Sequence, residues 1–400
     1  MSNSTKFVFV TCYLIVFSLQ GITGRHPDFY LSIEKLVNKY GYPMENHEVT
    51  TEDGYILTMF RIPHGRTGTE INQKLVILVH GLYGQAEHFI TNAMHNGSLA
   101  FLLADNGYDV WLMNSRGTQH GRKHIRLDPN ESKFWNFSWH EIAMYDLPAK
   151  IDYMLQKTKK SKLHYIGHSQ GGTIFYVLSA MKPEYQKKIQ LASLLSPAGY
   201  GGHIQFPLFQ YFGRHFDEIM RMVEKYNIYE FPNLGNSPSE LLLNTCIDSV
   251  FSSFCLLVMR NFNGIVTPNV DLEMLPLILR FIPTAAMKQS LHYLQGVISG
   301  RFRQWDYGNS QKNIEAYGTP EPPEYNVESI SVPVSIYYGL SDLQVTEKDL
   351  KLMCQSLQNC VSLHPMKDSK WSHYDYLLSN VAGEQFNVPL LRSMQKYDDD

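Results

Sequence analysis

Residues 163–181 read LHYIGHSQGGTIFYVLSAM, and this stretch changes character at its middle. The apolar run 163–167 is typical of a buried strand, whereas 171–181 is typical of a helix. Ser169 stands between them, at the centre of a G-x-S-x-G pattern. The pattern alone is weak, but a strand before it and a helix after it predict a tight turn that lifts the Ser169 hydroxyl above the sheet edge. We therefore interpret Ser169 as a nucleophile. The glycines mark positions where a side chain would collide with neighbouring backbone.

The same alternation of strands and helices extends along the chain. Further strands are predicted at 74–81, 108–114, 190–197, 332–342 and 361–366, and helices at 146–157, 346–357 and 383–396. Residues 48–63 read as a hairpin around Asp53 and Gly54. Asp146 is placed to cap the helix 146–157, and Pro148 is tolerated in its first turn. This order predicts an α/β fold with a mostly parallel central sheet and helices on both faces.

The segment 200–325 has a different character from the rest. It is rich in aromatic residues, leans towards helix and is interrupted by Pro and Gly, with no strand–helix alternation. We expect a helical insertion between two parts of one core, which would comprise residues 25–199 and 326–400.

The first 24 residues resemble a targeting segment. Lys6 precedes an uncharged, mainly apolar run at 7–19, which is shorter than the roughly 20 residues that span a bilayer. Gly21, Thr23 and Gly24 then offer small residues for cleavage. We predict a signal peptide at 1–24, with a signal anchor as the alternative. The expected destination is the extracellular space or the lysosome, with no integral membrane segment after cleavage.

Sequons and cysteines fit an exported chain. Asn96, Asn130 and Asn136 each begin an Asn-x-Ser sequon in polar or turn-rich sequence. Four cysteines follow the targeting segment and allow three disulfide connectivities. Their short separations favour Cys246–Cys255 and Cys354–Cys360, and buried free thiols are the alternative.

A nucleophilic serine needs a base and an acid that orients the base. In a strand–turn–helix setting of this kind they follow the serine in the order acid, then histidine. Asp342 follows a late predicted strand, and His373 follows the last one. Three rivals exist: His364 falls inside a predicted strand, and Asp368 and Asp375 follow the wrong strand.

An acyl transfer also needs donors for an oxyanion. We predict the backbone N–H of Gln170, directly after the nucleophile, and that of Leu82 in HGLYG, 80–84. An ordinary strand-to-helix turn is the alternative for HGLYG. His80 and His168 are interpreted as packing or hydrogen-bonding residues.

Several classes of function lack support. The net charge of -3 gives no basic face for nucleic acid. The 16 histidines are scattered without the spacing of a metal site. Neither a phosphate-binding loop nor a dinucleotide fingerprint occurs, so no cofactor or metal is expected.

With these residues placed, the chain resembles the acid lipase family, which includes gastric lipase and lysosomal acid lipase. The resemblance covers nearly the whole chain after the targeting segment. Its blocks are YGYPMENHEVTTEDGYILTMFRIP, HGLYG, NGSLAFLLADNGYDVWLMNSRG, FWNFSWHEIAMYDLPAKIDY, GHSQGG, YYGLSDLQV and SHYDYLL. Three features depart from the family pattern: HGLYG in place of HGLLA, Gly172 where Thr is common, and a Cys354–Cys360 pair that is not associated with the vertebrate members.

The resemblance implies an α/β-hydrolase fold with a catalytic triad of Ser169, Asp342 and His373, and with Leu82 and Gln170 as oxyanion donors. It also implies that 200–325 is a cap with a lid, and it supports a Cys246–Cys255 disulfide. The expected function is hydrolysis of neutral lipids, foremost triacylglycerols, at an oil–water or membrane interface. Cholesteryl esters or other carboxylic esters are the alternative substrates. A non-catalytic lipid carrier is a remote alternative. Such a protein would be expected to lose a triad member, whereas all three are present here in the required order.

Overall fold

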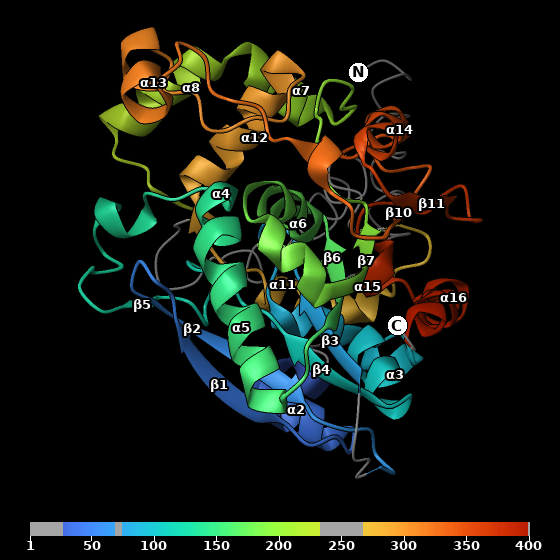
Figure 1. Ribbon diagram of the computed structural model, residues 1–400. Helices are drawn as coiled ribbons and strands as arrows, with labels where there is room; N and C mark the ends of the chain where they lie inside the picture. Colours follow the sequence, from blue (N-terminus) through green and yellow to red (C-terminus); the bar gives the residue numbers. More distant parts are fainter. Residues whose placement is uncertain (1–26, 69–73, 233–266, 399–400) are drawn as a thin grey trace, which may run out of the picture.

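The computed structural model describes residues 27–68, 74–232 and 267–398 (Figure 1). The predicted signal peptide and the predicted Cys246–Cys255 disulfide lie outside these residues. Their assignments therefore stay predictions.

A twisted, mostly parallel sheet forms the centre of the described chain. Its strands lie in the order β1-β2-β4-β3-β6-β7-β10-β11, and β5 pairs with β2. The neighbours of β2 are antiparallel to it, whereas the run from β4 through β3 to β11 is parallel. The bounds are β1 Glu45–Thr50, β2 Tyr55–Ile62, β3 Lys74–Val79, β4 Tyr108–Leu112, β5 Lys123–His124, β6 Leu163–His168, β7 Ile189–Leu195, β10 Val334–Tyr338 and β11 Cys360–Pro365.

Both faces of this sheet are covered, as the sequence predicts. Along β3, Leu75, Ile77 and Val79 belong to one apolar cluster, and Val76 and Leu78 belong to another. Because alternate residues of a strand point to opposite faces, β3 is buried on both sides. One face packs against α5 Leu147–Thr158, α6 Gln170–Met181 and α14 Glu347–Ser356. The other face packs against α2 Ile33–Lys39, α3 Leu99–Asp105 and α16 Val388–Met394.

The prediction that Asp146 caps a helix is wrong. The helical run begins earlier, at α4 Trp139–Glu141, where Ser138 and Glu141 form a capping box. A short π-helix at Ile142–Asp146 joins α4 to α5, so Asp146 already has helical backbone angles. Its carboxylate instead accepts hydrogen bonds from the backbone and side chain of the buried Arg116, at 2.9 and 2.7 Å. The placement of Pro148 in the first turn of α5 is confirmed.

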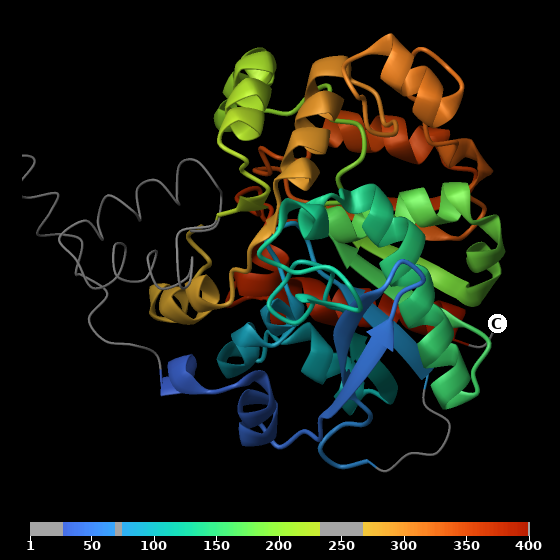
Figure 2. The same ribbon diagram turned by 90° about the vertical axis from the view of Figure 1, so that its left-hand side faces the viewer.

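The described part of 200–325 contributes helices beyond the sheet, and we call this proposed segment the cap. Its elements are α7 Pro207–Arg214, α8 Phe216–Lys225, β8 Glu230–Phe231, α11 Leu275–Arg280, β9 Ala285–Ala286, α12 Met287–Ser299 and α13 Ser310–Tyr317. Figures 1 and 2 show α7, α8, α12 and α13 gathered at one end of the molecule. The short strands β8 and β9 pair with each other, which ties the chain after α8 to the start of α12.

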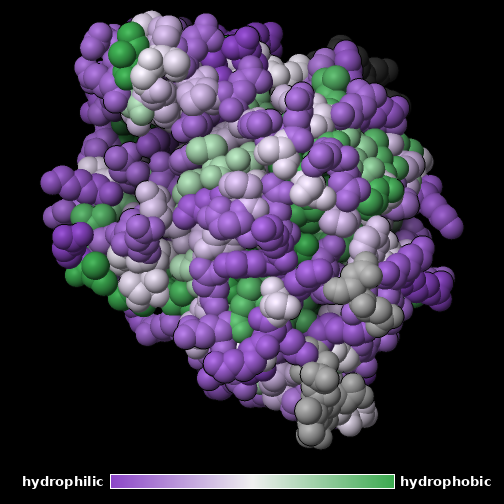
Figure 3. Space-filling model, viewed as in Figure 1, coloured by the Kyte–Doolittle hydropathy of each residue, from purple (hydrophilic) through white to green (hydrophobic). Residues whose placement is uncertain are grey.

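The surface is more hydrophilic than the apolar clusters inside the fold. On the face shown in Figure 3, hydrophilic residues cover most of the area and hydrophobic residues form separate patches. Among the described residues, no helix combines the length and the apolar character needed to cross a membrane.

Candidate active site

Ser169 occupies the turn between β6 and α6. Its backbone angles, φ 53° and ψ -113°, lie in a region that residues with side chains rarely adopt. Neighbouring atoms leave no room for side chains at the two glycines that follow in α6. A Cβ added at Gly171 would lie 2.4 Å from the carbonyl oxygen of Val79, and one at Gly172 would lie 2.2 Å from Cβ of Pro197. The turn is therefore the strained strand-to-helix elbow that the sequence predicts.

His373 and Asp342 form a buried pair beside this elbow. Nδ1 of His373 lies 2.8 Å from Oδ2 of Asp342. Asp342 comes from the loop after β10, and His373 comes from the loop between β11 and α15, Asp375–Leu378. The backbone N–H groups of Gln344 and Val345 donate to the other carboxylate oxygen of Asp342. Because the carboxylate accepts the Nδ1 proton, Nε2 of His373 is left free to take another proton.

The three predicted rivals have other partners. His364 lies inside β11 and its ring stacks on Tyr337 with 5.0 Å between centroids. Asp368 accepts a hydrogen bond from Asn269 at 2.7 Å. Asp375 accepts hydrogen bonds from Thr267 and from the backbone of Ser372. The structure thus brings Asp342 to His373, in agreement with the sequence order.

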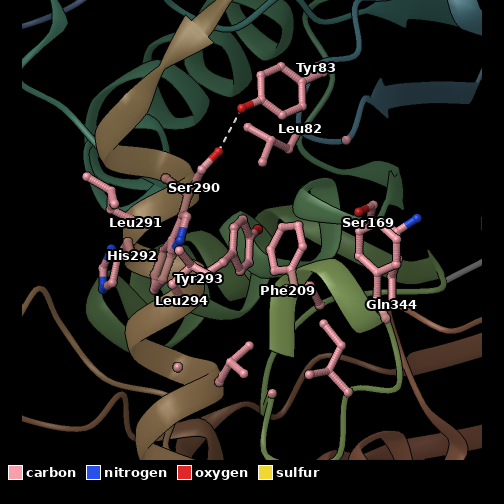
Figure 4. Close-up of a pocket in the computed structure, with 18 of the residues that line it drawn as sticks. Leu82, Tyr83, Ser169, Phe209, Ser290, Leu291, His292, Tyr293, Leu294 and Gln344 are labelled. Carbon is pink, nitrogen blue, oxygen red and sulfur yellow. Dashed lines mark hydrogen bonds between the residues drawn. The ribbon is translucent and has the colours of Figure 1, made fainter. Parts of the chain in front are cut away.

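Ser169 and His373 line one large cavity, of about 730 Å³. Its walls are mainly apolar and come from both the core and the cap (Figure 4). The apolar side chains contributed by α7, α8 and α12 include Leu208, Phe209, Phe212, Ile219, Met222, Val223, Leu291 and Leu294. A cavity of this size and character suits a large apolar ligand.

The HGLYG loop lies directly against the elbow. A Cβ added at Gly81 would come within 2.9 Å of Cβ of Ser169. Ser115 donates its backbone N–H to Nε2 of His80 at 3.1 Å, so the proton of His80 is on Nδ1, which lies 2.8 Å from the Gly81 carbonyl oxygen. That carbonyl shares one peptide group with the N–H of Leu82, so His80 fixes the direction of this predicted donor.

His168 joins the elbow to the loop that carries His373. Its Nε2 lies 2.8 Å from the carbonyl oxygen of His373. Burial, helped by the neighbouring His373, lowers the pKa of His168 to about 3. His168 is therefore neutral and donates this hydrogen bond, which confirms its interpretation as a hydrogen-bonding residue.

Two sequence-family models match the chain. One describes a partial α/β-hydrolase lipase region and matches residues 33–93, and the other describes the α/β hydrolase fold and matches residues 74–219. Lipase 1 of Drosophila melanogaster is 41% identical over 354 residues, which cover 88% of this chain and 76% of that protein. The chain belongs to the acid lipase family.

Other members of the acid lipase family match over an even larger share of their length. The gastric triacylglycerol lipase of Rattus norvegicus is 35% identical over 383 residues, which cover 94% of this chain and 95% of that protein. Among solved structures, one described as a putative lipase from Sulfolobus solfataricus has a TM-score of 0.57 at 16% identity, covering 88% of this chain and 94% of that one. At this low identity the likeness concerns the α/β hydrolase fold alone.

Two of the departures from the acid lipase pattern have a counterpart in the structure. Cys354 and Cys360 form a disulfide between α14 and β11, as predicted from their spacing. Threonine at position 172 would overlap Pro197, which accounts for glycine in this chain. The predicted glycosylation sites Asn96, Asn130 and Asn136 are all exposed, and their modification stays a prediction.

The sequence patterns did not predict that α12 contacts the HGLYG loop and α6 beside Ser169. Gln289, Ser290 and Tyr293 of this helix bond to Gln170, Tyr83 and Thr173 respectively, at 2.6, 2.8 and 2.8 Å. These partners are 119, 207 and 120 positions apart in the chain. No local pattern in the sequence connects them.

Proposed function

We propose that this chain is a triacylglycerol lipase that works through an acyl-enzyme on Ser169. The observation that carries the proposal is the buried hydrogen bond between His373 and Asp342, on an apolar cavity that Ser169 also lines. Membership of the acid lipase family, with a gastric triacylglycerol lipase among its members, supports the same substrate class.

The proposed reaction begins with attack of Ser169 on an ester carbonyl. Nε2 of His373 takes the proton of the Ser169 hydroxyl as the bond to carbon forms, and Asp342 stabilises the resulting imidazolium. The backbone N–H groups of Leu82 and Gln170 bind the oxyanion. His373 then gives its proton to the leaving alcohol, so that the acyl group stays on Ser169.

Water completes the proposed cycle. His373 takes a proton from the water as it attacks the acyl-enzyme, and a second tetrahedral intermediate forms at the same oxyanion site. Its collapse returns the proton to Ser169 and releases the fatty acid. The protons and bonds of these two reaction steps balance without a cofactor or a metal.

The setting of the enzyme is part of the proposal. We infer that residues 1–24 direct the chain into the secretory pathway, for action outside the cell or in the lysosome. We further propose a cap at 200–325, a Cys246–Cys255 disulfide and glycans on Asn96, Asn130 and Asn136. The substrate would be met at an oil–water or membrane interface.

The test compares wild type with Ser169→Ala. Turnover of emulsified triolein, cholesteryl oleate and a soluble short-chain ester is measured from pH 4 to pH 8, and each protein is treated with a fluorophosphonate probe. We expect triolein to be the preferred substrate, with labelling and turnover lost in Ser169→Ala by on the order of a millionfold. Ser356, whose hydroxyl bonds to the carbonyl of Leu352 within α14, supplies the control variant Ser356→Ala, which should behave like wild type.

Each contrary outcome has a clear meaning. Near-wild-type turnover by Ser169→Ala would exclude Ser169 as the nucleophile. A wild type that neither labels nor hydrolyses any of the three esters would favour a lipid carrier. A clear preference for cholesteryl oleate or for the soluble ester would keep the chemistry and overturn the substrate class.

A further inference from the structure

Two consecutive residues of α12 reach the two separate elements that carry the proposed oxyanion donors. Ser290 Oγ lies 2.8 Å from the hydroxyl oxygen of Tyr83, which directly follows Leu82 in the HGLYG loop. Gln289 Oε1 accepts a hydrogen bond of 2.6 Å from the side chain of Gln170. Figure 4 shows the hydroxyl of Tyr83 directed at Ser290, close to Leu82.

Tyr83 is held in an unfavourable conformation. Its φ of 57° lies in the left-handed region, which a bulky residue adopts only where the surroundings hold it. The hydroxyl stays protonated, because burial raises the pKa of Tyr83 to about 12. A neutral hydrogen bond therefore links Tyr83 of the HGLYG loop to Ser290. At the start of the same loop, His80 forms a hydrogen bond with the Gly81 carbonyl.

The contact through Gln289 is equally well enclosed. Gln170 and Gln289 are both buried, with 4% and 3% of their surface exposed. One helical turn further, the hydroxyl of Tyr293 lies 2.8 Å from that of Thr173, so α12 meets α6 at two points. Two contacts fix the register of one helix along the other, which a single contact does not.

We propose that α12 is the positioning element of the oxyanion hole, with Gln289 and Ser290 setting the distance between the Leu82 and Gln170 donors. The inference rests on the proposed function at Ser169. The two donors belong to different elements, a loop after β3 and the start of α6. Pairing of β3 with β6 fixes the strand ends that precede them, but among the described residues no backbone hydrogen bond joins the HGLYG loop to α6. Donors stabilise an oxyanion only when both are in place before the charge develops. Helix α12 contacts both elements through the side chains of Ser290 and Gln289.

The test uses the full-length protein and a soluble short-chain nitrophenyl ester, so that access of lipid to the cavity is not measured. Removing an oxyanion donor outright lowers kcat by roughly 100- to 1,000-fold, so loosening one should lower it by about 3- to 30-fold. We expect this loss in Tyr83→Phe, Ser290→Ala and Gln289→Leu, with KM within about twofold of wild type. The pH profile should keep its shape, because the His373–Asp342 pair is untouched.

Two comparisons make the test specific. The double variant Tyr83→Phe/Ser290→Ala should be no slower than the slower single variant, because both changes remove the same hydrogen bond. Ser290→Thr keeps a hydroxyl and should recover most of the activity. Ser299→Ala is the matched control, since the hydroxyl of Ser299 bonds to the carbonyl of Gln295 within α12 itself, and it should react like wild type.

A second measurement separates a loss of catalysis from a loss of folding stability in these variants. The rate of fluorophosphonate labelling at Ser169 depends on the same donors and should fall in parallel with kcat, while the midpoint of thermal unfolding reports stability separately. Unchanged kcat in Tyr83→Phe and Ser290→Ala overturns the inference, whether or not stability falls. Additive losses in the double variant also overturn it. Failure of the proposed function itself is distinguished by the wild type, which would then show no Ser169-dependent turnover.

Discussion

Nδ1 of His373 and Oδ2 of Asp342 lie 2.8 Å apart, and 3% or less of either side chain is exposed to solvent. Burial by itself raises the pKa of Asp342, but the charge and hydrogen bond of His373 outweigh burial and hold the pKa below its ordinary value. Asp342 is therefore ionised above about pH 4 and oriented towards His373.

Replacing Asp342 by asparagine should remove most of the catalysis. An amide at this position accepts or donates without fixing the tautomer of His373, and an analogous change in another serine hydrolase costs about 10,000-fold in kcat. We expect a loss of this order for Asp342→Asn in hydrolysis of a soluble ester. Asp368→Asn is the matched control, because Asp368 lies at a turn and bonds to Asn269. If Asp368→Asn lowers kcat as much as Asp342→Asn does, the proposed role of Asp342 in orienting His373 is contradicted.

The contribution of Asp375 to the free energy of unfolding should fall as the pH rises. Burial raises the pKa of Asp375 to about 6, despite hydrogen bonds from Thr267 and Ser372. The unfolded chain gives up this proton at a lower pH than the folded chain, so the contribution of Asp375 is most favourable below about pH 4 and is lost as the pH passes about 6. The difference of roughly two pKa units corresponds to about 3 kcal/mol.

Asp375→Asn should remove this dependence. The free energy of unfolding, measured with denaturant at pH 4, 5.5 and 7.5, should shift in favour of the variant by up to about 3 kcal/mol between the lowest and the highest pH. Glu52→Gln, at an exposed position in the turn between β1 and β2, serves as the control. A constant difference between wild type and Asp375→Asn at all three pH values would contradict the assignment.

Gly172 should not tolerate the residue that is common in the family. A threonine there would overlap Pro197, since even a Cβ would lie 2.2 Å from Cβ of Pro197. Overpacking of this kind typically costs about 1–3 kcal/mol, and here it would also displace the start of α6 behind Ser169. We expect Gly172→Thr to lower both the unfolding midpoint and kcat.

The control for this change is Gly296→Ala in α12. An added Cβ at Gly296 would meet only the Arg301 carbonyl oxygen, at 3.7 Å, and alanine favours a helix over glycine by up to about 1 kcal/mol. Gly296→Ala should therefore be as stable as wild type or more so. If Gly172→Thr proves as stable as Gly296→Ala, Pro197 must move freely and the steric explanation fails.

The Cys354–Cys360 disulfide should stabilise the fold without affecting catalysis. It closes a short loop between α14 and β11, with a separation of six residues. The loop-entropy model gives about 2 kcal/mol for a loop of this size. Replacing both cysteines by serine should lower the free energy of unfolding by about this amount and leave kcat unchanged, since neither residue lines the cavity. A large loss of kcat at a temperature where the variant is folded would contradict this role.

Most of the α/β core was predictable because its patterns are local. The elbow around Ser169 needs only a strand, two glycines and a helix, and all of these are adjacent in the chain. Asp342 and His373 could be found because parallel strands present their carboxyl ends at one edge of the sheet, so chain order limits the candidates.

The errors and omissions concern contacts between distant segments. Asp146 has the composition of a helix cap, but Arg116, 30 positions away, engages its carboxylate inside the core. The partnership of Tyr83 and Ser290 joins two segments 207 positions apart, and each residue is unremarkable in its own segment. Only packing in three dimensions decides such pairs.

The adjacency of Gln289 and Ser290 on α12 has a consequence for protein engineering. Adjacent residues of a helix point about 100° apart, so one turn of α12 reaches both the HGLYG loop and the start of α6. A cap grafted from another lipase would bring different side chains to both positions and would alter turnover as well as substrate entry. Cap exchanges aimed only at selectivity should therefore keep 289 and 290 together with Tyr83 as one inherited unit.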